Sequence, residues 1–406
     1  MSGALIALSA VGAQDAQLTA SPSFSFYQSV YRRYAPFQTE MRDQVFSGPV
    51  GWGQRSVCKV ARCGDLLGKT FLQMDLSVAP TTVPGGIGWY AAEAAISHIE
   101  LWIGGQLIDR HYSPYFRLYD ECIRNEDFRQ AYSSLTDCRN ASAGQSVQLY
   151  LPLLFSFCSL DPAMAIPLVS LQYADVELVV YWSDTPPLGL SDKIEATLVS
   201  EYVFLGPQER ATMAQNPNTM LITQVQALRT PVDIRSAEHA NNILLSFNHP
   251  VSSLLFAFGA PGVANHGIFT GGTTPLQSNE ALAPLKSARL MLNGTEYGKA
   301  RNGQFTRLIN SWARKNQVPS AGVYSMHFCL DPSASQPSGS INMSRVDNVS
   351  LDIVTKAASA STAAAVVNPL TTTITACQDL TYLIVYAINF NWLRFESGMC
   401  GMAFSS

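Results

Sequence analysis

Apolar and polar side chains alternate with a period of two along many short stretches of this chain. In residues 72–78 every second side chain is Leu, Met or Val, and those between them are Gln, Asp and Ser. Residues 147–157 alternate in the same way, and in residues 384–392 the even-numbered side chains Ile, Tyr, Phe and Trp share one face. A period of two is typical of a strand with one buried face, so the pattern predicts mainly β structure.

Further stretches of this kind are separated by turns rich in Gly and Pro. They lie at residues 98–104, 175–182, 194–205, 221–228, 242–247, 252–258, 287–292, 322–328 and 349–355. Helical signals are few: we expect a short helix from Pro207 to the Asn216-Pro217 pair, and two more at about 114–122 and 303–314. Many short strands between such turns predict a sandwich or a barrel.

Two segments of the chain are echoed later in the same order. "ELWIGGQLIDRHYSPYF" aligns with "RLMLNGTEYGKARNGQF" at a constant offset of 189 residues, as Leu101 and Leu290 show (290 − 101). "FCSLDPAMAIP" aligns with "FCLDPSASQP" at an offset of 171, as Phe157 and Phe328 show (328 − 157), which falls to 170 further along. An ordered repeat of this kind indicates two copies of one β-domain.

The repeat sets the predicted domain organisation. We expect an N-terminal arm at 1–20, a first β-domain at 21–205, a linker with a short helix at 206–220 and a second β-domain at 221–406. The fold class that fits best is all-β: two tandem eight-stranded antiparallel jelly rolls with a few short helices in the loops and the linker. The small-residue segment 356–373 is expected to form a long loop at one end of the second domain.

Charge is scarce in this chain of 406 residues. Hydrophobic residues make up 47% and charged residues 14%, against about 25% charged in an average soluble protein. A chain with so few charges is expected to share much of its surface with partners. The formal net charge of −4 lacks the basic surplus of a dedicated nucleic-acid binder, so no direct nucleic-acid contact is expected.

Residues 23–34, "SFSFYQSVYRRY", combine aromatic side chains with arginines. Such a surface can stack bases and grip phosphates. The alternation of Phe24 and Phe26 with serines equally suits the first strand of a sandwich, with Arg32 and Arg33 as interface or ion-pair residues. The acidic balance of the chain favours the structural interpretation.

Signals for catalysis or metal binding are weak. His98 and Glu100 share a strand face but are too few for a metal site, and adjacency alone does not make Asp109, Arg110 and His111 a hydrolase triad. No nucleophile elbow, P-loop or dinucleotide fingerprint occurs. We therefore expect no enzymatic activity, no metal and no cofactor.

Two alternatives stay open at this point. Paired carboxylates among Glu93, Glu100, Asp120 and Glu121 would suit a jelly-roll glycosidase. The sequons at Asn140 and Asn293 are possible glycan acceptors, although Asn293-Gly294 is more typical of a type I′ hairpin turn. The eight scattered cysteines and an opening without a basic region predict free thiols in a reducing compartment and no secretory signal.

Several blocks of the sequence resemble one known family throughout its length. They include "GAQDAQLTASPSFSFYQSVYRRYAPF", "IELWIGGQLIDRH", "EYVFLGPQERATMAQNP", "FNHPVSSLLFAF" and "VYAINFNWLRFESGMCGMAFS". In this order they are similar to the double jelly-roll major capsid proteins of nucleocytoplasmic large DNA viruses. The resemblance implies a structural protein whose homotrimers form pseudo-hexagonal capsomers that tile an icosahedral shell over an internal membrane.

The resemblance also implies partners and a location. The implied partners are neighbouring capsomers, minor capsid proteins and an internal membrane on the inner face. The implied location is the virion capsid, assembled in the host cytoplasm. Two other functions remain alternatives: a minor or vertex capsid paralogue, and a jelly-roll protein that binds or hydrolyses glycans.

Overall fold

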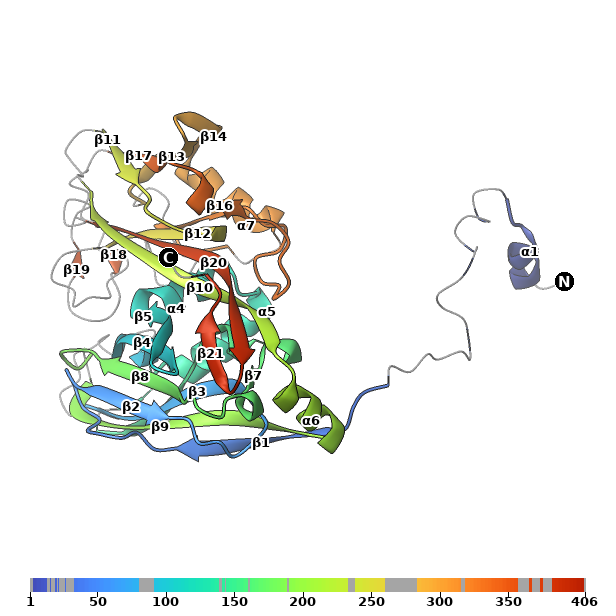
Figure 1. The fold of residues 1–406 in the computed structure, drawn as a ribbon. Helices are drawn as coiled ribbons and strands as arrows, with labels where there is room; N and C mark the ends of the chain where they lie inside the picture. The colour runs from blue at the N-terminus through green and yellow to red at the C-terminus, as the bar shows by residue number, and fades with distance from the viewer. Residues whose placement is uncertain are drawn as a thin grey trace. The chain divides into compact units, whose positions relative to one another are not determined.

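The structure is a computed structural model, and it describes most of the chain. The described residues are 3–12, 15, 19, 21, 26, 33–79, 91–138 (without the side chains of 126, 127 and 129), 141–142, 144–159, 161–187, 190–232, 238–259, 283–314, 318–356, 365–366 and 373–374 (backbone alone), and 382–404. The chain divides into two units, Met1–Phe37 and Gln38–Ser406. The first unit holds helix α1 (Gly3–Ser9), and the second holds the sheets apart from Phe37, the first residue of strand β1 (Figure 1).

The first half of the main unit contains two facing antiparallel sheets. One has the strand order β1-β9-β3-β6, with β7 paired to β3, and the other has the order β2-β8-β4-β5. Their bounds are β1 (Phe37–Gln44), β2 (Arg55–Lys59), β3 (Leu66–Val78), β4 (Ile96–Ile103), β5 (Gln106–Tyr112), β6 (Ser146–Pro152), β7 (Ile166–Pro167), β8 (Val176–Trp182) and β9 (Leu190–Leu205).

The second half repeats this arrangement. Its sheets have the orders β10-β20-β12-β15, with β16 paired to β12 and β21 to β20, and β11-β17-β13-β14, and a separate pair joins β18 to β19. The bounds are β10 (Asn218–Pro231), β11 (His239–Leu244), β12 (Pro250–Gly259), β13 (Leu285–Leu292), β14 (Thr295–Asn302), β15 (Val323–His327), β16 (Ile341–Asn342), β17 (Val349–Thr355), β18 (Ala365–Val366), β19 (Thr373–Ile374), β20 (Tyr382–Glu396) and β21 (Met399–Met402).

The main strands of both halves follow one scheme. Counted along the described part of the chain, the first, eighth, third and sixth strands form one sheet of each half, and the second, seventh, fourth and fifth form the other. This is the strand order of a jelly roll, in which two sheets pack face to face. The predicted fold class, an all-β chain of two jelly rolls, is confirmed, while the residue boundaries predicted for the domains stay a proposal.

Short helices connect the strands. They are α3 (Ala91–Ala94), α4 (Ser113–Cys122), α5 (Glu126–Thr136), α6 (Pro207–Gln215), the π-helical η6 (Phe305–Ile309) and α7 (Asn310–Ala313), with 3-10 turns η1 (Ser156–Cys158), η2 (Pro162–Met164), η3 (Leu168–Ser170) and η7 (Met343–Arg345). The helices predicted near 114–122 and from Pro207 are confirmed, and 303–314 contains η6 and α7. Helix α5 was not expected. No helix in the described ranges is long and apolar enough to cross a membrane.

The echoed segments occupy equivalent places in the two sandwiches. The first echo forms the hairpin β4–β5 followed by α4 in one half, and β13–β14 followed by η6 in the other. Asn293 and Gly294 have φ angles of 48° and 78°, so the predicted type I′ turn is confirmed. The second echo follows β6 and β15, and its two copies touch: Asp161 Oδ2 accepts hydrogen bonds from Ser335 Oγ at 3.0 Å and Gln336 Nε2 at 3.3 Å.

Each sandwich has its own apolar core, and a third cluster joins them. The predicted inward face of 72–78 lies in the first core, with Leu72, Met74 and Leu76 buried. In the third cluster, apolar side chains of α4 cover the outer face of the β10-β20-β12-β15 sheet; its buried members are Tyr115, Leu118, Cys122, Ile123, Leu255, Ala257, Val323, Ile384, Tyr386 and Ile388. The two sandwiches are therefore held by a buried apolar contact as well as by the linker.

Strand β20 differs from the half-buried strand that its alternation predicted. Both faces are buried along its first part, because the odd-numbered Leu383, Val385 and Ala387 lie in the core of its own sandwich while the even-numbered face meets α4. Further along, Leu393 and Phe395 enter the core of the first sandwich. One strand thus contributes to all three clusters.

The first strand of the first sandwich also differs from expectation. We expected it to include Phe24 and Phe26, but the first strand that the structure describes in the sheets is β1, which begins at Phe37. Phe26 lies in a turn with 82% of its surface exposed, and Phe24 and Arg32 lie outside the described residues. The predicted loop at 356–373 also falls largely outside them.

The contact between α4 and the second sandwich makes a testable contribution to stability. Leu118→Ala removes a side chain that is 0% exposed in the third cluster, and we expect the free energy of unfolding to fall by about 3 kcal/mol. Urea unfolding at one protein concentration measures the change. The matched control Leu330→Ala removes a side chain that is 71% exposed and should change it by less than about 0.5 kcal/mol. Equal effects of the two substitutions would contradict the account.

Candidate functional site at the junction of the two sandwiches

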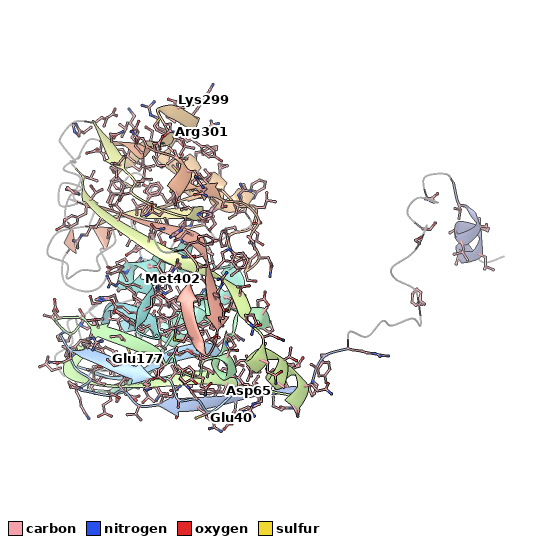
Figure 2. All side chains as sticks on the ribbon, viewed as in Figure 1. Glu40, Asp65, Glu177, Lys299, Arg301 and Met402 are labelled. Carbon is pink, nitrogen blue, oxygen red and sulfur yellow. The ribbon has the colours of Figure 1, made fainter. Side chains whose placement is uncertain are left out.

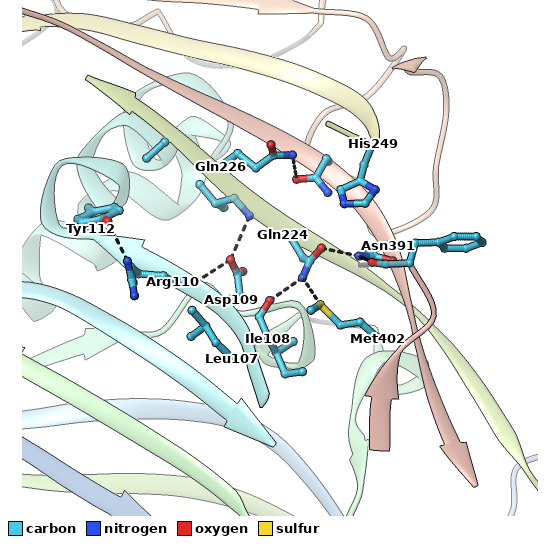
Figure 3. A pocket seen from close by; sticks show the side chains of 14 residues that line it. Leu107, Ile108, Asp109, Arg110, Tyr112, Gln224, Gln226, His249, Asn391 and Met402 are labelled. Atoms are coloured by element: carbon cyan, nitrogen blue, oxygen red, sulfur yellow. Dashed lines mark hydrogen bonds between the residues drawn. The ribbon is translucent and has the colours of Figure 1, made fainter. Parts of the chain in front are cut away.

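Two sheet edges from different halves of the chain meet at a pocket of about 300 Å3 (Figure 3). Strand β5 of the first sandwich lies on one side and β10 of the second on the other. The backbone N–H of Val225 donates to Asp109 Oδ1 over 3.1 Å, and Gln224 Nε2 donates to the carbonyl of Ile108 over 2.5 Å. Side chains of one edge therefore bind the backbone of the other.

Buried amides extend this contact toward β20. Asn391 Nδ2 donates to Gln224 Oε1 over 2.8 Å and to the carbonyl of Phe404 over 2.9 Å. Gln226 Nε2 donates to Asn389 Oδ1 over 3.0 Å, and both asparagines are almost fully buried. A buried hydrogen-bond network of this kind fixes the relative orientation of the elements that it joins. The chemistry of the pocket is therefore suited to positioning the two sandwiches.

The polar trio after β4 belongs to the same junction. His111 Nε2 lies 2.9 Å from Asp109 Oδ2, and the His111 ring stacks on Phe155 with 4.4 Å between ring centres. His111 is 1% exposed and Asp109 is 7% exposed, and both oxygens of Asp109 are engaged, one with His111 and one with backbone N–H groups. Arg110 turns to the other face and contacts Glu100. The residues that suggested a hydrolase triad make a structural pair instead.

Glu100, which was considered above as half of a metal site, forms a buried ion pair with Arg110. Its carboxylate is buried and accepts hydrogen bonds from Arg110 Nε at 2.7 Å and from Trp102 Nε1 at 2.9 Å. The His98 ring stacks on the Tyr181 ring with 4.1 Å between the ring centres, and burial lowers the pKa of the His98 imidazole. Across the described ranges, the structure brings together no group of three or more His, Cys, Asp or Glu side chains that would hold a metal ion.

The other three candidate carboxylates are buried and engaged. Glu121 accepts from Arg117 Nε at 3.1 Å and from the backbone N–H of Ser320 in the second sandwich at 2.8 Å. Asp120 lies 3.5 Å from Arg124 Nε, and Glu93 accepts a hydrogen bond from the hydroxyl of Tyr132. A glycosidase needs two carboxyl groups facing a sugar in an open cleft. These carboxylates instead stabilise the packing of α3, α4 and α5.

A second hollow lies beside α5. It encloses about 520 Å3 and is mainly apolar, with aromatic walls that include Phe71, Phe128 and Tyr132. Asp161 is its one acidic lining residue in the described part of the chain, and its oxygens are bound to Ser335, Gln336 and the backbone N–H of Ala163. This hollow therefore lacks the paired carboxylates of a glycan hydrolase.

Comparison with known proteins decides the family. Residues 25–206 match a family described as the major capsid protein N-terminus, and residues 209–401 match one described as the large eukaryotic DNA virus major capsid protein. The major capsid protein of Paramecium bursaria Chlorella virus 1 is 35% identical over 444 aligned residues, which cover 100% of both chains. This chain belongs to the family of major capsid proteins of large eukaryotic DNA viruses.

Further relatives agree with this assignment. The major capsid protein of Pyramimonas orientalis virus is 30% identical, with 100% of both chains covered. A chain of the quasi-atomic PBCV-1 virus capsid is 32% identical, with a TM-score of 0.84 over 94% of this chain and 100% of that one. The Faustovirus major capsid protein shares the fold, with a TM-score of 0.70 at 13% identity over 95% and 94% of the chains. The protein is thus a structural component of the icosahedral virion capsid of a large DNA virus.

The remaining candidate residues of this capsid protein have scattered positions. Arg33 is exposed in the N-terminal unit. Asn293 lies at the tip of the β13–β14 hairpin, where its Oδ1 accepts from the backbone N–H of Asn348 over 2.9 Å. Asn140 lies outside the described residues. Interface roles for the arginines and glycan attachment at the asparagines stay predictions.

The junction amides of the capsid protein were missed by sequence reasoning. Asn389 and Asn391 share one face of a strand that is otherwise largely apolar, in the run "YAINFNW". Two polar side chains two residues apart on a strand point the same way, toward one polar contact. That spacing was the available signal, but it did not reveal that Gln224 would be the partner.

The buried Glu93 makes the stability of the capsid protein depend on pH. Burial raises the pKa of Glu93 to about 8 despite the hydrogen bond from Tyr132, so the folded chain favours the protonated acid. Its contribution is complete below the ordinary pKa of about 4.3 and is lost as pH rises through about 8. We expect the stability of Glu93→Gln relative to the wild type to increase between about pH 5 and pH 9, because the amide stays neutral.

Urea unfolding across this pH range measures the difference between the two proteins. The control Glu195→Gln changes an exposed carboxylate on β9 and should give a nearly constant difference from the wild type. Parallel pH curves for the wild type and Glu93→Gln would show that Glu93 does not titrate as proposed.

Proposed function

We propose that this protein is the main shell-forming subunit of its virion and that it acts as a homotrimer. The observation that carries the proposal is the presence of two sandwiches with the same strand order in one compact unit, Gln38–Ser406. Three such chains provide six similar walls, which lets a three-fold ring occupy a six-coordinated position in a shell. Closed rings of this kind are a common way to cover exposed sheet edges and apolar side chains.

The surface of the main unit supports assembly. Large apolar side chains remain exposed on it, among them Trp312 at 78%, Tyr173 at 71% and Tyr297 at 52%. Obligate interfaces are more apolar than the average protein surface, and a chain with 14% charged residues suits them. Trimers would thus be the stable unit, and contacts between trimers would be smaller and more polar.

The finer features of this function rest on the same proposal. The trimers would tile as pseudo-hexagonal capsomers, with minor capsid proteins and an internal membrane on the inner face and without direct contact to nucleic acid. Assembly would take place in the host cytoplasm. The engagement of the four candidate carboxylates inside the fold supports a purely structural role without catalysis.

The molecular mass of the purified full chain tests the proposal. We expect light scattering after size exclusion to give three times the chain mass of 44.1 kDa at micromolar concentration. The apolar surface described above is the reason, since it is covered only when copies associate. A stable monomer at that concentration would contradict the proposal.

A further inference from the structure

The two copies of the internal repeat are exposed to very different degrees. With the offset of 189 residues, Ile123 at the end of α4 corresponds to Trp312 in α7 (312 − 123). Ile123 is 1% exposed because α4 covers the sheet of the second sandwich, whereas Trp312 is 78% exposed. Ile309, on the preceding turn, is 46% exposed. The counterparts of Tyr115, Leu118 and Cys122 are the polar Gln304, Arg307 and Ser311, so the exposed apolar surface of η6 and α7 consists of Ile309 and Trp312.

The first sandwich also has a sheet face that is equivalent to the one covered by α4 in the second sandwich. Ala257 pairs with Val323 and Ile384, and all three lie beneath α4. By the common strand order, β3, β6 and β9 of the first sandwich are the counterparts of β12, β15 and β20 of the second. Phe71 on β3 pairs with Pro152 on β6 and with Val199 on β9, so these three residues form a patch across the equivalent three strands.

This equivalent patch is only partly covered. Phe71, Pro152 and Val199 lie on the outer face of the β1-β9-β3-β6 sheet and are half-buried. The apolar hollow of about 520 Å3 borders the patch, since Phe71 and Pro152 line it. The first sandwich therefore offers a receiving surface for a helix, at the place where the second sandwich receives α4.

The sheet edges beside these surfaces show the same difference. Within the chain, the edge strand β5 is covered by β10, and Ile108 on β5 is 4% exposed. The equivalent strand β14 is exposed at every residue, and the counterpart of Ile108, Tyr297, is 52% exposed. Strand β1, the counterpart of β10, is exposed at six of its eight residues. Figure 2 shows Lys299 and Arg301 on β14 and Glu40 on β1.

We propose that η6 and α7, with Trp312 as the anchor, dock on the Phe71–Pro152–Val199 patch of a second copy of this chain. Strand β14 then lies beside β1 of that copy, as β5 lies beside β10 within one chain. The contact is head-to-tail, and it closes into a ring when three copies join. This inference rests on the proposed trimer and names the surfaces that form it.

The first variant removes the anchor. Trp312→Ala should weaken subunit association by at least about 30-fold, as is typical when a central Trp is lost from an interface. Because Trp312 is 78% exposed in the single chain, the far-ultraviolet circular dichroism should stay that of the wild type. Mass photometry over a dilution series measures the trimer fraction of each protein.

A second variant tests the receiving patch, and a third serves as the control. Val199→Lys places a charge on the patch and should weaken association to a similar extent. Leu244→Ala removes a side chain that is 61% exposed on β11, at the opposite edge of the sheet from β14, and should leave the trimer intact. If Trp312→Ala and Val199→Lys both keep the wild-type dilution curve, the docking is wrong although the trimer stands.

A cross-linking measurement needs no variant. A zero-length carbodiimide should join Lys299 on β14 to Glu40 or Asp43 on β1 between isotopically distinct chains of the wild-type trimer. Cross-links that join β14 to β14 would overturn the head-to-tail contact. A wild-type protein that is monomeric throughout would instead refute the proposed function itself, so the two failures are distinguishable.

Discussion

The contact of helix α4 with the outer face of the β10-β20-β12-β15 sheet is the interaction on which the rest of the structure depends. A sandwich needs to bury only one face of each sheet, yet here the second face is buried as well. Each fully buried side chain such as Leu118 or Ile123 contributes about 2 kcal/mol. The hydrogen bonds of Gln224 and Asp109 across the β5–β10 contact then fix the direction in which the two sandwiches lie.

Much of the fold could be predicted because it depends on residues that are close together in the sequence. The period-two alternation of residues 72–78 matches the alternating burial along β3, because only one face of that strand packs in a core. The Asn293-Gly294 turn has positive φ at both positions, and the Asn-Gly dipeptide is by itself typical of such a turn. The echo of the β4–β5 hairpin in β13–β14 indicated two copies of one sandwich, and the common strand order has the same origin.

The rest could not be predicted because it depends on contacts between distant parts of the chain. One face of β20 packs in the core of its own sandwich and the other packs against α4. The alternation of side chains along β20 therefore does not distinguish a buried face from an exposed one. Glu93 looks like a surface acid in the sequence, but a buried pocket with Tyr132 encloses it. Strand β1 has little apolar alternation, since it is an exposed edge, and it was missed for that reason.

The central claim is that the chain uses one contact twice, once within itself through α4 and once between copies through α7. Single-particle cryo-electron microscopy of the purified oligomer tests this most directly. The account predicts six sandwiches in a ring, with Trp312 of each chain against Phe71 and Val199 of the next. A map in which Trp312 faces solvent, or in which two equivalent sandwiches face each other across a two-fold axis, would contradict it.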